Sequence, residues 1–379
     1  MSRPQIAAVL GVSLPTAGAL VKHLIASGLL GEFGRGQSRG GRPAQLVQLN
    51  PQYAHAVGLL VTFASVQAVA VNLAGEIVFW GETEPTDCRS VDAVLDQTAR
   101  LTQTVVAKSP GLQVRGLGVA IAGVVDPDSR LVRTFPSVHD WRNVPFGELM
   151  AQRLGLPCEI RNNVQAATLA ELHFGLGRQS QNVMYLHVFR GIGVGLISEG
   201  RLLCGRRGCA GELGHTVVEP DGPVCHCDNR GCLESVAGPH AIVRDAIAAL
   251  KRGVDSTIAP ADAADPITFD QVLAAANTSD PLAVELLAQA GRKIGLAVAG
   301  LANAVNPDVL VLGGLLAREP PVLAETIRRT FLADLMPAVA EEMTISVSPI
   351  RDLPACIGAA TAVFDRLLAA KRGLIPTEV

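Results

Sequence analysis

The chain has 379 residues, of which 49% are hydrophobic and 18% are charged, with 38 Gly and 23 Pro. This composition excludes a disordered, collagen-like or coiled-coil chain, and the length suffices for two or three folded domains. The charge is uneven: residues 1–50 carry five basic residues and one acidic residue, whereas the other 329 carry 27 basic and 34 acidic residues. A basic head on an acidic body predicts that a polyanionic partner binds the head.

The first residues carry the signals of two short helices. Ser2-Arg3-Pro4-Gln5 has the form of a capping box with Pro in the first turn, and Ser13 is the expected N-cap of a second helix that ends near Gly28. Two short helices around a tight turn at Gly11 predict a helix-turn-helix. The alternative is an ordinary helical hairpin.

A basic, glycine-rich segment at 34–43 and a predicted strand at 46–49 follow these helices. This pattern is typical of a wing whose extended Gly-Gly-Arg-Pro stretch can place Arg42 in a narrow minor groove of DNA. The alternative is a solvated linker, but directly after a helix-turn-helix the pattern favours double-stranded DNA as a partner. The residues predicted to contact DNA are Leu14, Pro15, Thr16, Lys22, Arg35, Arg39 and Arg42.

From Pro51 onward, strands alternate with helices, which indicates an α/β protein. Two strand-rich starts, near Val57 and Val183, predict two similar lobes, and Gly313-Gly314 is expected to open a helix. Predicted strands cover 57–61, 66–71, 77–80, 117–121, 183–188 and 309–312, and predicted helices cover 91–106, 165–174, 281–304 and 357–368.

No membrane partner is expected. Polar residues interrupt the uncharged stretch 43–75, which favours two buried strands over a membrane span, and the N-terminus lacks the pattern of a signal peptide. Eight cysteines are too few for a disulfide scaffold of this length. We therefore expect a cytoplasmic protein.

A cluster of cysteines carries a metal signal. Cys225, Cys227 and Cys232 fall within eight residues, and His215 precedes them. One imidazole and three thiolates complete a tetrahedral zinc site with no open position, so we predict a structural zinc ion rather than four unrelated loop residues. His226 is an alternative fourth ligand, but its neighbours on both sides are ligands themselves, so strain argues against it.

These residues belong to a longer pattern. The run Gly211-Glu212-Leu213-Gly214-His215, followed by Cys225-x-Cys227-x4-Cys232-Leu233-Glu234, resembles the signature of the ROK family of repressors, open reading frames and sugar kinases. With its N-terminal winged helix, the chain resembles the repressor branch. The resemblance spans essentially the whole chain and includes Ala122-Gly123, Pro136–Trp141, Asn162-Asn163, the glycine turn 191–195, Asn306–Asp308 and Gly358–Ala360.

The resemblance implies an actin-like (ribonuclease-H-like) sugar-kinase body of two lobes behind the winged helix-turn-helix of residues 1–50. Lobe one would cover about 51–162 plus the C-terminal helix 357–370, and lobe two about 163–356. A homodimer or tetramer would present two heads to a pseudo-palindromic site, and zinc would brace a loop that binds a sugar or sugar derivative. The residues implied to face the sugar are Ser137, Asn162, Asn163, Glu212, His215 and Glu234.

The chain departs from the kinase branch at two positions that phosphoryl transfer needs. The general base of the kinases is an Asp, but Asn163 stands here, and an amide is not a useful proton acceptor. The first phosphate loop has lost its Asp and reads Leu60–Ala64, with bulky residues where backbone must approach phosphate. We therefore expect a kinase-dead sensor that represses carbohydrate-related genes.

Two alternatives stay open at this point. One is an ATP-dependent kinase of a hexose or amino sugar with a vestigial head, and the other is a zinc-braced protein that acts only through protein contacts. The head of the repressors that the chain resembles has a further helix before the one at residue 3. Either translation is expected to begin upstream of Met1, or the head is degraded.

Overall fold

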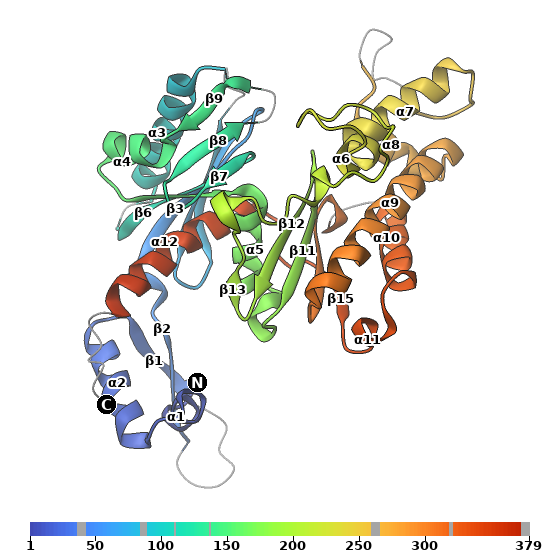
Figure 1. The fold of residues 1–379 in the computed structure, drawn as a ribbon. Coiled ribbons are helices and arrows are strands. Elements are labelled where there is room, and N and C mark those ends of the chain that lie inside the picture. The colour runs from blue at the N-terminus through green and yellow to red at the C-terminus, as the bar shows by residue number, and fades with distance from the viewer. Residues whose placement is uncertain are drawn as a thin grey trace.

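A computed structural model describes residues 1–35, 43–83, 89–109, 111–135, 138–258, 266–317 and 321–372 (Figure 1). A small N-terminal head is followed by a larger body of two lobes, each built on a five-stranded sheet. The predicted α/β class and two-lobed architecture are confirmed.

The helices of the head begin where the sequence predicts. α1 (Arg3–Leu10) starts with the complete capping box, in which Gln5 Oε1 accepts the Ser2 N–H at 2.8 Å. Ser13 Oγ accepts the Thr16 N–H at the start of α2 (Leu14–Ala26). Among the described helices, none alone is long and apolar enough to cross a membrane; α1 and α2 meet that test only jointly, and they are bent by 111°.

The wing of the head is a short antiparallel sheet. β1 (Leu30–Arg35) pairs with β2 (Gln45–Leu49). Met1 exchanges two backbone hydrogen bonds with Val47, so the first residues lie along the free edge of β2. Leu24 and Leu29 pack the head against the adjoining end of lobe one.

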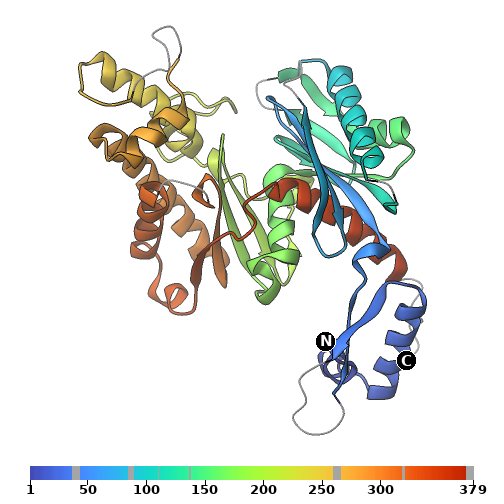
Figure 2. The ribbon, with the colours of Figure 1, turned by 180° about the vertical axis from the view of Figure 1, so that it is seen from behind.

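Lobe one is the sheet ordered β10-β6-β3-β4-β5 with the helices that cover it. α3 and α4 cover one face, and α12 covers the other (Figure 2). A three-stranded sheet of β7, β8 and β9, which the sequence analysis did not predict, follows β6. The elements are β3 (His55–Val61), β4 (Val66–Asn72), β5 (Ile77–Thr83), α3 (Val91–Ala107), β6 (Val114–Ile121), β7 (Val124–Asp126), β8 (Leu131–Phe135), β9 (Val138–Val144), α4 (Phe146–Leu154), β10 (Cys158–Asn162) and α12 (Pro354–Arg372).

Lobe two is the sheet ordered β13-β12-β11-β14-β15 with its helices. The predicted helix at Gly313-Gly314 is wrong: both glycines end β14, and the next long helix begins at Pro321. The elements are α5 (Asn163–Phe174), β11 (Val183–Val188), β12 (Ile192–Ser198), β13 (Arg201–Leu202), α6 (Leu233–Ala237), α7 (Pro239–Lys251), α8 (Phe269–Asn277), α9 (Pro281–Val305), β14 (Val309–Gly314), α10 (Pro321–Ala333), α11 (Pro337–Ala340) and β15 (Thr344–Val347).

Two helices join the lobes. α12 lies on the sheet of lobe one and packs along α5, which lies on the sheet of lobe two (Figures 1 and 2). The approach is close enough to require glycine: a Cβ at Gly118 would lie 1.8 Å from Ala359 O, and a Cβ at Gly358 would lie 1.6 Å from Ala166 O. Because α5 also contacts β6 and β10, the predicted lobe boundaries near 162 and 356 stay predictions.

Candidate functional site

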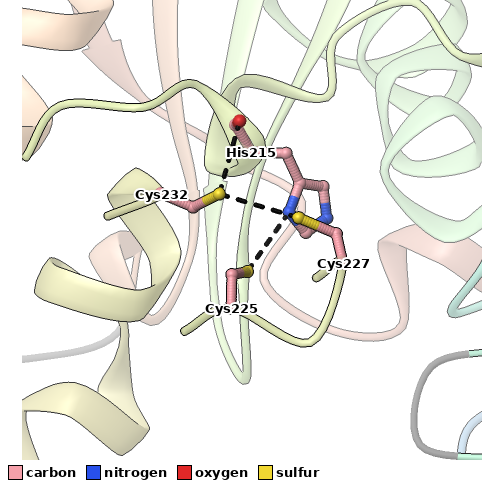
Figure 3. Close-up of side chains that lie close together, drawn as sticks. All are labelled: His215, Cys225, Cys227 and Cys232. Carbon is pink, nitrogen blue, oxygen red and sulfur yellow. Dashed lines mark hydrogen bonds between the residues drawn. The ribbon is translucent and has the colours of Figure 1, made fainter. Parts of the chain in front are cut away.

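Four side chains from separate parts of one loop region form a candidate metal centre (Figure 3). His215 ends the short helix η4 (Leu213–His215), and Cys232 directly precedes α6. Their ligand atoms and those of Cys225 and Cys227 all lie within 4.8 Å of one another. Cys227 Sγ and Cys232 Sγ are 3.6 Å apart, and Cys225 Sγ lies 3.6 Å from His215 Nδ1.

The chemistry of this cluster fits a bound cation. Burial and the neighbouring thiols raise the pKa of Cys232 to about 12, and burial also raises the pKa of Cys225. Burial lowers the pKa of His215, which favours the neutral imidazole that ligates metals. A positive ion among these thiols offsets the cost of their ionisation, so the four residues can hold a metal.

His226 lies beside this cluster rather than in it. Its Nδ1 is 3.9 Å from Cys225 Sγ and 3.3 Å from Glu234 Oε1. The set in which all ligand atoms come together contains His215, which is the ligand that the strain argument favoured.

Two of the predicted sugar-facing residues, Glu212 and Glu234, lie beside the metal centre, and a third, His215, is part of it. Glu212 Oε2 lies 3.8 Å from His215 Nε2. Glu234 Oε2 accepts the Ile192 N–H at 2.8 Å, at the glycine turn that opens β12. Burial, and then the negative charge of Glu234, raise the pKa of Glu212. Two carboxylates and an imidazole can exchange hydrogen bonds with a polyol.

The other predicted sugar-facing residues are placed differently. Asn162 Oδ1 accepts the N–H groups of Val164 and Gln165, and Asn162 Nδ2 donates to Gly123 O at 2.9 Å. Its side chain therefore caps α5 and ties that helix to lobe one. Asn163 is the partly exposed first residue of α5. Ser137 lies outside the described residues.

The sequence reasoning missed a buried polar residue in the first turn of α5. Gln165 Nε2 donates to Gly208 O at 3.0 Å, while its Oε1 has no hydrogen-bond partner within the described part of the chain. A buried acceptor without a partner needs a ligand or an ordered water. The available signal was a glutamine on the buried side of a predicted helix.

The turn between β3 and β4, which corresponds to the first phosphate loop of the kinases, is held together by hydrogen bonds among its own residues. Thr62 Oγ1 accepts the N–H groups of Ala64 at 3.2 Å and Ser65 at 3.1 Å, and the Thr62 N–H donates to Ser65 O. Phe63, at the tip, has 50% of its surface exposed. The backbone donors of Thr62, Ala64 and Ser65 are thus used within the turn.

Only some of the residues predicted to contact DNA lie in the described part of the chain. Leu14, Pro15 and Lys22 are exposed on α2. Thr16 is partly buried, and its Oγ1 lies 2.8 Å from Ser13 Oγ. The side chain of Arg35, at the end of β1, and the whole of Arg39 and Arg42 lie outside the described residues.

Comparison with known proteins gives the family. Residues 64–366 match the ROK family. The chain belongs to the ROK family. The resemblance seen in the Glu-x-Gly-His and cysteine pattern is therefore confirmed.

Relatives within the ROK family include both repressors and a kinase. A xylose repressor of Caldicellulosiruptor bescii is 27% identical over 371 residues, covering 97% of this chain and 93% of that protein. The Escherichia coli DNA-binding transcriptional dual regulator NagC is 29% identical over 373 residues, covering 97% of this chain and 89% of NagC. A glucokinase of Thermotoga maritima is 32% identical over 277 residues, covering 72% of this chain and 86% of the enzyme.

Solved structures of ROK proteins likewise include a transcriptional regulator and a kinase. A ROK transcriptional regulator, a homologue of the E. coli MLC protein, has a TM-score of 0.82 and 26% identity, covering 98% of this chain and 94% of its own. A ROK glucokinase from Streptomyces griseus has a TM-score of 0.73 and 26% identity, covering 82% of this chain and 100% of its own. The regulator matches nearly the whole length of this chain, and the glucokinase matches a smaller share of it.

Proposed function

We propose that this ROK protein is a sugar-responsive transcriptional repressor of carbohydrate-related genes that acts in the cytoplasm. One observation carries the proposal: the similarity to a xylose repressor and to the DNA-binding transcriptional dual regulator NagC extends over 97% of the chain, whereas the similarity to the T. maritima glucokinase covers 72%. The two capped helices and the paired wing strands of the head support DNA binding.

The head would bind double-stranded DNA through α2 and the wing. Leu14 and Pro15, exposed at the start of α2, offer apolar contacts, and Lys22 offers a charge to a phosphate. The wing arginines Arg35, Arg39 and Arg42 would supply the rest of the affinity. A homodimer or tetramer would place two heads on two half-sites.

The sugar or sugar derivative would bind beside the metal centre. Glu212, His215 and Glu234 converge there, and Asn163 and Ser137 are the other candidate contacts. Asn162 would shape the site as the cap of α5, through its bond to Gly123 O.

The metal would be a structural zinc ion. Thiolates bound at ~2.3 Å to a tetrahedral zinc lie ~3.8 Å apart, and Cys227 Sγ and Cys232 Sγ are already 3.6 Å apart. One imidazole and three thiolates fill the four positions, so zinc would hold His215 and the loop around it in place without binding a substrate itself.

The body would have no kinase activity. An amide at Asn163 cannot serve as the general base, and the turn at Thr62 uses its own backbone donors. A phosphate placed there would meet Phe63 rather than free N–H groups.

A gel shift with DNA from the region flanking its own gene tests the repressor function. We expect a specific shift that weakens strongly between about 50 and about 200 mM salt, because phosphate contacts dominate affinity. Lys22→Ala should weaken binding of specific and unrelated DNA alike, whereas Lys251→Ala, on α7 of lobe two, should not. Xylose, glucose and N-acetylglucosamine are the first effectors to add. Equal binding to unrelated DNA would contradict the proposal.

The kinase alternative has its own observation, the 32% identity to a glucokinase. Incubation with ATP and each of the three sugars decides between the two functions. We expect no sugar phosphate. Phosphorylation that is lost in Glu212→Ala would replace the repressor function with the kinase function.

A further inference from the structure

One side-chain contact bridges the lobes outside the helix pair α5 and α12. The guanidinium carbon of Arg190 lies 4.4 Å from the centre of the Phe63 ring, a cation–π geometry. Phe63 is at the tip of the β3–β4 turn of lobe one, and Arg190 is in the β11–β12 turn of lobe two. The contact therefore joins two hairpin tips that belong to different sheets.

In the part of the chain that the structure describes, the charge of Arg190 has no competing partner. Within the described residues, Arg190 makes no ion pair or hydrogen bond, and both it and Phe63 are exposed. The nearby carboxylate of Glu234 is already engaged by the Ile192 N–H and by His226. The face of the Phe63 ring is thus the specific neighbour of this cation.

The contact joins two turns in which several backbone N–H groups already have partners. The β3–β4 turn is the equivalent of the first phosphate loop, and its backbone donors at Thr62, Ala64 and Ser65 are used internally. The β11–β12 turn is the glycine turn, whose Ile192 N–H is bonded to Glu234. An aromatic ring on the turn that corresponds to the first phosphate loop thus meets a guanidinium on the glycine turn of the other lobe.

We propose that Phe63 and Arg190 form an interlobe latch, which holds the two turns together without a nucleotide and favours the closed arrangement of the lobes. This inference rests on the proposed sensor function, because a sensor needs lobe closure that does not depend on nucleotide. An exposed cation–π contact changes an equilibrium only about two- to fivefold. Such a weak latch still lets the lobes open for a ligand.

The contact is tested by fluorine NMR on the intact, zinc-loaded protein with 4-fluorophenylalanine at position 63. Arg190→Ala should shift the fluorine resonance, since the ring loses its cation, and Arg190→Lys should shift it less. Arg201→Ala, which removes an exposed arginine from β13 of the same sheet, is the matched control and should leave the resonance unchanged. A resonance that Arg190→Ala does not move would overturn the proposal.

Lobe closure is measured on the same variants by small-angle X-ray scattering. Arg190→Ala and Phe63→Leu should each increase the open fraction about two- to fivefold, and the double variant should go no further than either single variant. Scattering that stays at the wild-type profile would also overturn the latch, because the contact would then not govern closure. Neither measurement uses DNA or sugar, so the repressor function can fail in its own assays independently of this result.

Discussion

Cys227 is the residue through which the metal centre is most directly tested. Its Sγ lies 3.6 Å from that of Cys232, and the side chain is only partly buried. Cys227→Ser should remove most of the bound zinc and open the loop before α6 to protease, because formation of the site and folding of the loop are coupled. The measurement is zinc content per chain by atomic absorption.

The matched control for this variant is Cys209→Ser, which replaces an exposed thiol outside the cluster. It should keep one zinc ion per chain. If Cys227→Ser also keeps one, the assignment of Cys227 as a ligand is wrong.

Asp126 makes a pH-dependent contribution to stability. Hydrogen bonds from Ser129 and Arg133 lower its pKa to about 2. The unfolded chain has a value near ~3.9, so the contribution is present above about pH 4 and is lost as pH falls towards 2. Asp126→Asn should lower the free energy of unfolding at pH 7 by about 2 kcal/mol.

Urea unfolding at pH 7 and near pH 2 measures this effect. The difference between wild type and Asp126→Asn should shrink at the lower pH. Asp92→Asn is the control, because Asp92 pairs with Arg153 on the surface with 84% of its side chain exposed. A difference for Asp126→Asn that is equal at both pH values would contradict the assignment.

At the residue scale, clusters of residues that are close in sequence could be predicted, whereas contacts between distant segments could not. The cluster of His215 with three cysteines that could hold a metal was predicted because the cysteines lie within eight residues. The contact of Phe63 with Arg190 was not predicted, nor was Gln165 Oε1, which has no hydrogen-bond partner among the described residues. Both depend on segments that meet only in the folded chain.

At the scale of elements, the contact between α5 and α12 depends on glycine at position 358, where a side chain would not fit. A Cβ at Gly358 would lie 1.6 Å from Ala166 O, which belongs to the backbone of α5 and cannot move aside alone. Gly358→Ala should therefore cost about 3 kcal/mol of unfolding free energy through overpacking. Gly300→Ala, on α9, is the matched helical control.

The control should change stability in the opposite direction. A Cβ at Gly300 meets no atom of the described residues within 4 Å, and Ala is the better helix former by about 1 kcal/mol. Denaturant midpoints of the two variants measure both effects. Equal midpoints for the two variants would show that the close approach at Gly358 does not constrain the lobes.

Helices and buried strands were predicted better than irregular strands. The capping box at Ser2 and the N-cap at Ser13 placed α1 and α2 because caps are local signals. The strands β7 to β9 were missed, since their short pairs carry register shifts. Two non-glycine residues also have positive φ here: Arg130 in the β7–β8 turn and Asn143 within β9. Gly313-Gly314 misled the prediction, because glycine at the end of a strand was taken for the start of a helix.

At the scale of the whole molecule, the uneven charge of the chain follows its division into a head and two lobes. The described part of the net positive stretch 1–50 includes the helices and strands of the head, and the elements of the two lobes come from the net negative remainder. A polyanion is therefore expected at the head alone. The two-lobed body was predictable from the alternation of strands and helices, whereas the packing of α12 onto lobe one, far from it in sequence, followed only from the family resemblance.

Selection from a pool of random DNA duplexes by the intact, zinc-loaded chain tests the central claim most directly. The repressor function predicts enrichment of an inverted repeat whose half-sites are about 10 base pairs apart, centre to centre, or a multiple of that spacing. It also predicts that a sugar changes the amount of DNA retained. A selected pool with no sequence preference would contradict the claim that this ROK protein reads DNA.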